Sequence, residues 1–166
     1  MERTCRNTEL SIANVGQTVT LVGWVSRKRN LGSILFIDLR DRSGIIQIYV
    51  KEGMEIPDVR SEYVLSVTGE VAKRSQPNPK MKTGDIEIIA SKIELVNTAK
   101  TTPLLIQDDT DALEEVRLKY RYLDLRRPCM QHYLDVRHQI KMAAHEYLDS
   151  LSFIEVETPV LTLSTP

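Results

Sequence analysis

Three side chains in the first hundred residues have the chemistry to read a nucleic-acid base. Apolar and polar residues alternate around Phe36, Gln47 and Glu87, which predicts that all three point away from the apolar faces of their strands. A phenyl ring can stack on an unpaired base, and an amide and a carboxylate can hydrogen bond along its edge. A solvated surface with one stray aromatic would show the same pattern, because exposed apolar residues are common. Both interpretations stay open on these residues alone.

Basic residues cluster near these side chains although the whole chain is not basic. They lie at two predicted turns and around a proline-rich loop: Arg27, Lys28, Arg29, Arg40, Arg42, Lys73, Arg74, Lys80 and Lys82. Such a face could follow the phosphates of a nucleic acid. The totals, 22 Lys and Arg against 23 Asp and Glu, exclude a histone-like protein but not a local binding face.

A second basic and aromatic segment covers residues 117–128 (RLKYRYLDLRRP). It could contact nucleic acid or a neighbouring domain. A charged helix or a hinge would account for the same composition. This segment therefore does not by itself assign a function.

Period-two alternation predicts the strands that position the first set of side chains. Five successive segments alternate and are rich in β-branched residues: 18–26, 33–40, 44–50, 63–71 and 84–95. Tight turns follow the first and second segments, and a short helix is expected near residues 58–62. Five strands with a helix between the third and fourth predict a mainly β OB-fold, a five-stranded Greek-key barrel. An SH3-like barrel is the alternative on pattern alone.

The pattern changes after the fifth segment. Residues 97–111 are polar and indicate a linker, and from Pro128 onward apolar residues recur at helical spacing up to Leu151. Residues 153–157 (FIEVE) then predict a strand. The expected organisation is a barrel over 1–100, a linker or hinge over 101–127 and the start of another domain over 128–166. One helix and one strand cannot bury their own apolar faces, so we expect the chain to be truncated or to need a partner.

Several protein classes are excluded by composition and spacing. No apolar run approaches 18 residues, and the N-terminus is polar and mixed in charge, so neither a membrane span nor a secretory signal is expected. Cys5 and Cys129 are far apart and form neither a metal-ligand pair nor a disulfide framework. We expect a cytoplasmic protein with reduced thiols and no metal site.

Longer strings of residues carry a family resemblance. They are residues 22–41 (VGWVSRKRNLGSILFIDLRD), 44–47 (GIIQ), 68–69 (TG), 84–88 (GDIEI), 117–128 and 153–166 (FIEVETPVLTLSTP). Together they resemble the N-terminal part of bacterial-type aspartyl-tRNA synthetases over nearly the whole chain. The first string is typical of the aspartate, asparagine and lysine group of class II synthetases, and residues 117–128 resemble the bacterial aspartate type.

The resemblance implies an OB-fold anticodon-binding domain, a hinge and the opening of a class II catalytic domain built on an antiparallel sheet. Residues 133–159 resemble the first class II signature, which packs at a homodimer interface, and Pro159 matches its proline. The signatures that bind ATP are not among the 166 residues. The full-length family enzyme activates L-aspartate with ATP and Mg²⁺ and transfers it to tRNA(Asp), or to both tRNA(Asp) and tRNA(Asn). This chain alone is expected to be catalytically inactive and to bind no cofactor.

The resemblance also assigns roles to the outward side chains. Phe36 matches the aromatic that stacks on an anticodon base, Gln47 the amide that reads the central uracil, and Glu87 the carboxylate that reads the first anticodon base. Alternation alone singles out the same three residues. The agreement favours the base-reading interpretation of this face.

Further anticodon contacts are implied around these three. Arg29 matches a nearby anticodon contact, and Asn78 matches an asparagine near the third anticodon base. The expected RNA backbone contacts are Arg27, Arg60 and Arg74. Two departures weaken the match: the loop over 75–82 is shorter than in some members, and Ala72 stands where many members carry an arginine.

Two functions compete on this sequence. One is a piece of an aspartate–tRNA ligase, and the other is a free-standing OB-fold module that binds tRNA or single strands without catalysis. The gene sequence beyond codon 166 would separate them. A structural dimerisation piece is a third possibility, which rests only on the first class II signature.

Overall fold

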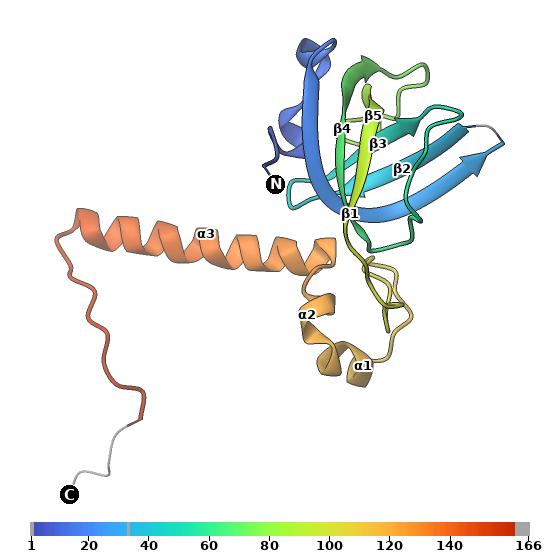
Figure 1. Ribbon diagram of the computed structural model, residues 1–166. Coiled ribbons are helices and arrows are strands. Elements are labelled where there is room, and N and C mark those ends of the chain that lie inside the picture. The colour runs from blue at the N-terminus through green and yellow to red at the C-terminus, as the bar shows by residue number, and fades with distance from the viewer. Residues whose placement is uncertain (1, 33, 162–166) are drawn as a thin grey trace, which may run out of the picture. The chain divides into compact units, whose positions relative to one another are not determined.

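The computed structural model describes residues 2–32 and 34–161 and divides the chain into two compact units, Met1–Thr102 and Pro103–Pro166. Figure 1 shows the first unit as a β-barrel and the second as helices followed by an extended segment. Ser33, the expected first residue of the second strand, and residues 162–166 of the last family string lie outside the described residues. Within the described ranges, no helix is long and apolar enough to cross a membrane.

The first unit is a closed barrel of five strands. These are β1 (Thr18–Leu31), β2 (Ile34–Arg40), β3 (Ile45–Val50), β4 (Val64–Lys73) and β5 (Ile86–Asn97). The order around the barrel is β1-β2-β3-β5-β4, and β1 pairs with β4 to close it. Only the β3–β5 pair is parallel among the described pairs. The OB-fold prediction is confirmed.

The barrel interior is filled by the apolar residues that the alternation predicts. Branched aliphatic side chains from all five strands are almost completely buried: Val19, Leu21, Val25, Ile37, Leu39, Ile46, Ile48, Leu65, Val67, Val71, Ile86 and Ile88. Successive residues of a strand face opposite sides, so one apolar set per strand is enough to fill the barrel. The other set is left on the outer face.

A β-bulge in β1 interrupts this alternation at Ser26. Before it, Leu21 and Val25 face inward, and the pairing register with β2 then shifts between Val25 and Arg27. A bulge adds one residue to one strand and reverses the faces of the residues that follow. Arg27 and Arg29 consequently lie on the outer face, whereas unbroken alternation would have placed them on the side of Leu21.

The helix expected over residues 58–62 is not formed. These residues make a turn in which Glu62 has a φ of 64°. The Glu62 amide donates to the Val25 carbonyl at 2.8 Å, and the Val25 amide donates to the Tyr63 carbonyl at 2.9 Å. Val59, in the same segment, is buried in the core. The prediction was wrong because hydrogen bonds to β1 and burial of Val59 compete with a local helix.

The second unit begins with two short helices in the segment expected to be a linker or hinge. They are α1 (Glu114–Lys119) and α2 (Arg121–Asp124), and Asp124 is fully buried. Its carboxylate accepts hydrogen bonds from Arg117 at 3.0 Å, from Arg127 at 2.8 Å and from Arg121. Burial raises the pKa of Asp124, but the hydrogen bonds from Arg127 and Arg117 outweigh it, and the pKa lies below its ordinary value.

The long helix α3 (Pro128–Ser150) starts with proline in its first turn, as expected. Its end is a Schellman motif: Ser152 has a φ of 66°, its amide donates to the Asp149 carbonyl, and the Phe153 amide donates to the Leu148 carbonyl. Tyr133 and Ile140 on its predicted apolar stripe are exposed.

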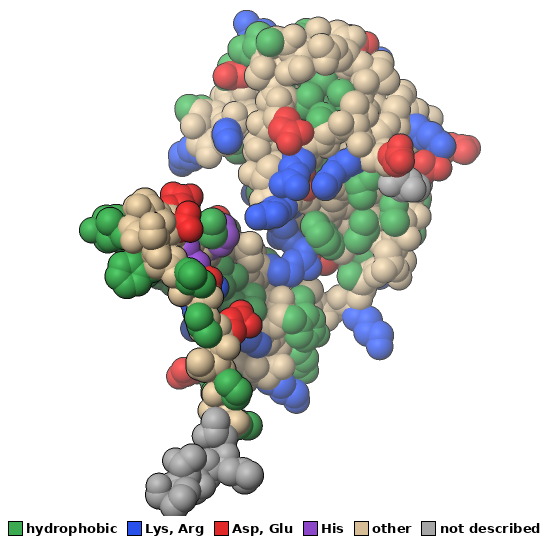
Figure 2. Space-filling view, turned by 90° about the vertical axis from the view of Figure 1, so that its left-hand side faces the viewer, with side chains coloured by type: hydrophobic (Ala, Val, Ile, Leu, Met, Phe, Trp, Pro, Cys, Tyr) green, Lys and Arg blue, Asp and Glu red, His purple; other side chains and the backbone are tan. Residues whose placement is uncertain are grey.

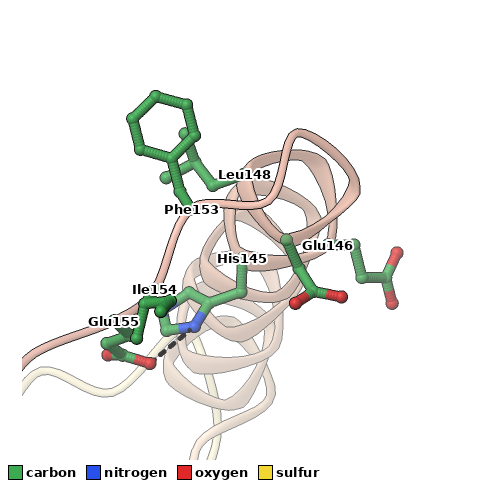
Figure 3. A pocket seen from close by; sticks show the side chains of 7 residues that line it. His145, Glu146, Leu148, Phe153, Ile154 and Glu155 are labelled. Atoms are coloured by element: carbon green, nitrogen blue, oxygen red, sulfur yellow. Dashed lines mark ion pairs between the residues drawn. The ribbon is translucent and has the colours of Figure 1, made fainter.

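The strand expected over residues 153–157 is not formed either. The segment instead lies beside the end of α3, and Glu155 Oε2 is 3.0 Å from His145 Nδ1. The last turns of α3 and this segment together line a shallow hollow (Figure 3). A strand needs a neighbouring strand to take up its backbone hydrogen bonds. Among the described residues of this unit there is no such neighbour.

Candidate nucleic-acid interface

The pairing register assembles a row of polar residues across the outer face of the barrel. Arg27 of β1 is opposite Asp38 of β2, which is opposite Gln47 of β3, which is opposite Glu87 of β5. These four residues, here called the polar row, come from four different strands. Pairing of neighbouring strands brings them side by side although they are up to sixty positions apart in the sequence.

A second row, here called the aromatic row, runs directly beside it. It consists of Arg29, Phe36, Tyr49 and Ile89, which are paired across β1, β2, β3 and β5. The Phe36 and Tyr49 rings meet edge to face with centroids 5.6 Å apart, and the Arg29 guanidinium lies 5.8 Å from the Phe36 centroid. The face thus offers rings that can stack next to groups that can hydrogen bond.

Gln47 is the centre of the hydrogen bonds on this face. Its Oε1 accepts from Arg74 at 2.8 Å and from Arg29 at 3.1 Å, and its Nε2 donates to Glu87 Oε2 at 2.7 Å. The side chain is on the outer face, as predicted, yet the residue is only 4% exposed. Neighbouring charged side chains cover the amide.

The charges of this cluster are balanced. Arg29 also donates to Asp38 Oδ1 at 2.7 Å, so two guanidinium groups, of Arg29 and Arg74, face the two carboxylates of Asp38 and Glu87. Balanced charges leave little net potential to attract phosphates. Attraction of an RNA backbone must come from basic residues outside the cluster.

Exposed basic residues are available for that purpose. Arg27, Arg42, Lys73, Lys80 and Lys82 are all exposed on the barrel. Figure 2 shows Lys and Arg side chains gathered near the middle of the view, with hydrophobic side chains nearby.

The other predicted contacts are placed less centrally. Arg60 is exposed and pairs with Asp58 at 2.8 Å. The side-chain oxygen of Asn78 accepts from the backbone amide of Lys80, and the backbone amide of Asn78 donates to the Gly84 carbonyl at 2.9 Å. A Cβ on Gly84 would lie 1.8 Å from the Asn78 carbonyl oxygen, so only glycine permits this close loop. Pro159 lies in the exposed segment after α3.

Sequence reasoning assigned no role in the site to Asp38 or Tyr49. Both occupy outward positions of the same alternating strands, so their faces were predictable. Their contacts were not, because the contacts depend on the cross-strand register and on the bulge in β1. Among the described residues, no group of three or more His, Cys, Asp and Glu side chains is placed to hold a metal ion.

The sequence matches two protein families. Residues 19–96 match the family described as an OB-fold nucleic acid binding domain, and residues 113–166 match tRNA synthetases class II (D, K and N). Over 99% of its length, the chain is 51% identical to an aspartate–tRNA(Asp/Asn) ligase of Bacillus mycoides. The chain is homologous to the N-terminal part of bacterial-type aspartate–tRNA ligases. It spans 29% of the length of the Bacillus relative.

Solved synthetase structures share its fold. Asparaginyl-tRNA synthetase from Pyrococcus horikoshii is 26% identical and has a TM-score of 0.81 over 96% of this chain and 37% of the solved chain. Aspartyl-tRNA synthetase from Entamoeba histolytica has a TM-score of 0.82 over 92% of this chain and 38% of its own, at 24% identity, which supports the fold alone.

Proposed function

We propose that the polar and aromatic rows bind the anticodon of a tRNA, as part of an aspartate–tRNA ligase. The observation that carries the proposal is the buried amide of Gln47, bonded to Glu87 at 2.7 Å, close to the aromatic row. Buried hydrogen-bonding groups next to a stacking ring are what recognition of a single-stranded, splayed base requires. The family assignment adds independent support.

The hydrogen bonds around Gln47 indicate how a base would be selected. An anticodon base stacks on Phe36, while the central uracil exchanges bonds with Gln47 and a guanine at the first position donates to Glu87. A base that cannot replace the bonds it displaces leaves a buried polar group unpaired, which costs about 1–3 kcal/mol. Selection then comes from the penalty on wrong bases as much as from contacts with the right one.

Exposed cations around the rows would hold the RNA backbone. The exposure of Arg27 and Arg60 supports this role, and Asn78 lies in the loop proposed to approach the third anticodon base. Arg74 also donates to Gln47 Oε1 at 2.8 Å. Its proposed phosphate contact would come in addition to that bond.

Binding of anticodon stem-loops by the chain tests this function. We expect the aspartate anticodon loop to bind more tightly than loops with a single change at the first or central position. Equal affinity for all loops would favour a free-standing module that binds single strands without reading them. No binding at physiological salt would contradict both.

The whole-protein properties are proposed from family membership. A protein containing this chain would activate L-aspartate with ATP and Mg²⁺ and transfer it to tRNA(Asp), and the name of the Bacillus relative supports tRNA(Asn) as a second acceptor. It would act as a cytoplasmic homodimer with Pro159 at the interface. The proposed division is an anticodon domain over 1–100, a hinge over 101–127 and the start of the catalytic domain over 128–166. None of the residues proposed as sites in this chain is assigned to ATP or Mg²⁺.

A further inference from the structure

We propose that Asp38 is a positioning residue that orients Gln47 for base reading by holding Arg29. This inference rests on the proposed anticodon-binding function. Asp38 Oδ1 accepts from Arg29 Nη2 at 2.7 Å, and the same nitrogen donates to Gln47 Oε1 at 3.1 Å. Asp38 itself would contact no base. It would act through Arg29 Nη2 on Gln47, which does.

The shared nitrogen decides which end of the Gln47 amide faces Glu87. Guanidinium groups only donate, so the two arginines can bond only the oxygen of the amide. Because Gln47 Oε1 accepts from Arg29 and Arg74, the Nε2 of the same amide faces Glu87, as observed. Nε2 carries two hydrogens, of which one is used on Glu87. The second can be donated to a carbonyl oxygen of uracil.

Asp38 is what keeps Arg29 in this position. Arginine has many rotamers, and Arg29 precedes the exposed end of β1, where its side chain is 36% exposed. The Asp38 side chain is only 16% exposed, so their bond is partly shielded from solvent. Without that carboxylate, Arg29 is freed to move toward solvent or a phosphate. The Gln47 oxygen then loses one of its two donors, and only Arg74 and Glu87 still hold the amide in its orientation.

This role predicts an unusual combination of effects. Removing the negative charge of Asp38 makes the face more positive, so general affinity for RNA should not fall. Discrimination at the central anticodon position should fall, because the amide that reads it is held less firmly in its orientation. A merely structural role would instead lower thermal stability and weaken all loops together.

The test compares Asp38→Asn and Asp38→Ala in the full chain. The matched control is Glu62→Gln, which removes another poorly exposed carboxylate that pairs with an arginine of β2, Arg40, at 2.7 Å. Affinity is measured for aspartate anticodon stem-loops carrying uracil or cytosine at the central position, together with thermal unfolding. We expect the uracil preference to fall about tenfold in Asp38→Ala, and less in Asp38→Asn, because an amide oxygen still accepts from Arg29. Glu62→Gln should keep the wild-type preference.

A double-mutant cycle with Arg29→Ala completes the test. If Asp38 acts through Arg29, the double variant should discriminate no worse than Arg29→Ala alone. An unchanged uracil preference in Asp38→Ala, additive losses in the cycle, or an equal loss for both loops with a lower unfolding temperature would each overturn the inference. A wild-type chain that shows no uracil preference would instead contradict the proposed function, so the two failures are distinguishable.

Discussion

Phe36 is the residue of the interface whose removal should be easiest to interpret. Its ring lies in the aromatic row, in edge contact with Tyr49 and outside the buried core. Phe36→Ala should weaken binding of the aspartate anticodon stem-loop by about 1–3 kcal/mol, the usual effect of losing one stacked base. Thermal unfolding should change little. A large drop in stability with intact binding would contradict its place on the outer face.

Mutation of Glu87 should change the choice of base, whereas mutation of Arg60 should change the affinity for every RNA. Glu87→Ala should relax the choice at the first anticodon position, because it removes a hydrogen-bond acceptor from the base-reading cluster. Arg60→Ala should weaken every stem-loop about equally and reduce the slope of log affinity against log salt by about one, as loss of one phosphate contact does. Titrations of single-base variants at several salt concentrations separate the two. An equal loss on every sequence for Glu87→Ala would remove it from base reading.

The carboxylate of Asp124 connects α1, α2 and the start of α3 through Arg117, Arg121 and Arg127. Its pKa is lowered in the folded chain, so its contribution to stability is fully present above its unfolded pKa of about 3.9 and is lost as pH falls through the lower folded value. Asp124→Asn should remove this acid dependence from the helices. It should also destabilise them, because Arg117, Arg121 and Arg127 lose the negative charge that they share.

Helical circular dichroism and hydrogen exchange of α1 to α3 between pH 7 and pH 2 measure this effect. Asp135→Asn is the matched control, since Asp135 is an exposed carboxylate on α3. The control should behave as the wild type. A wild-type acid transition that persists unchanged in Asp124→Asn would show that another carboxylate governs it.

At the scale of the whole molecule, the barrel should fold without the second unit. Its core is a single cluster running from Leu10 to Ile93, all within the first unit. Ending the chain near Thr110 should leave anticodon binding largely intact. Loss of the cooperative unfolding transition in that shorter chain would show that the barrel needs residues beyond it.

The second unit should be the part of the chain that self-associates. Phe153, Ile154 and Val156 are 64%, 86% and 73% exposed, and such surface is unfavourable in water by ~25 cal/mol per Å². Hydrogen exchange on the monomeric chain should show strong protection in the barrel strands and little over residues 153–161. Removing the second unit should reduce oligomerisation, which sedimentation measures.

Aspartate activation by the 166-residue chain alone should be undetectable. Pyrophosphate exchange needs cationic groups placed around the ATP phosphates and a pocket for the amino acid. In the family, those groups belong to signatures that the 166 residues do not contain. Aspartate-dependent ATP–pyrophosphate exchange that persists in a contaminant-free preparation would contradict this expectation.

The sequence alone determined the barrel core and the faces of the strands, except beyond the bulge in β1. The reason is local: the pleat sends successive side chains to opposite sides, so Ile37 and Leu39 face inward while Phe36 and Asp38 face outward. The family resemblance of the sequence also assigned roles to Phe36, Gln47 and Glu87. Those assignments remain predictions about binding.

Tertiary structure decided what each outward side chain contacts. The bulge at Ser26 turned Arg29 onto the outer face, and the register of four strands brought it to Gln47, which became buried beneath charged neighbours. Two predictions, the short helix over 58–62 and the strand over 153–157, were wrong for the same physical reason. Hydrogen bonds and burial depend on partners that lie far away in the sequence, and local patterns carry no record of where those partners are.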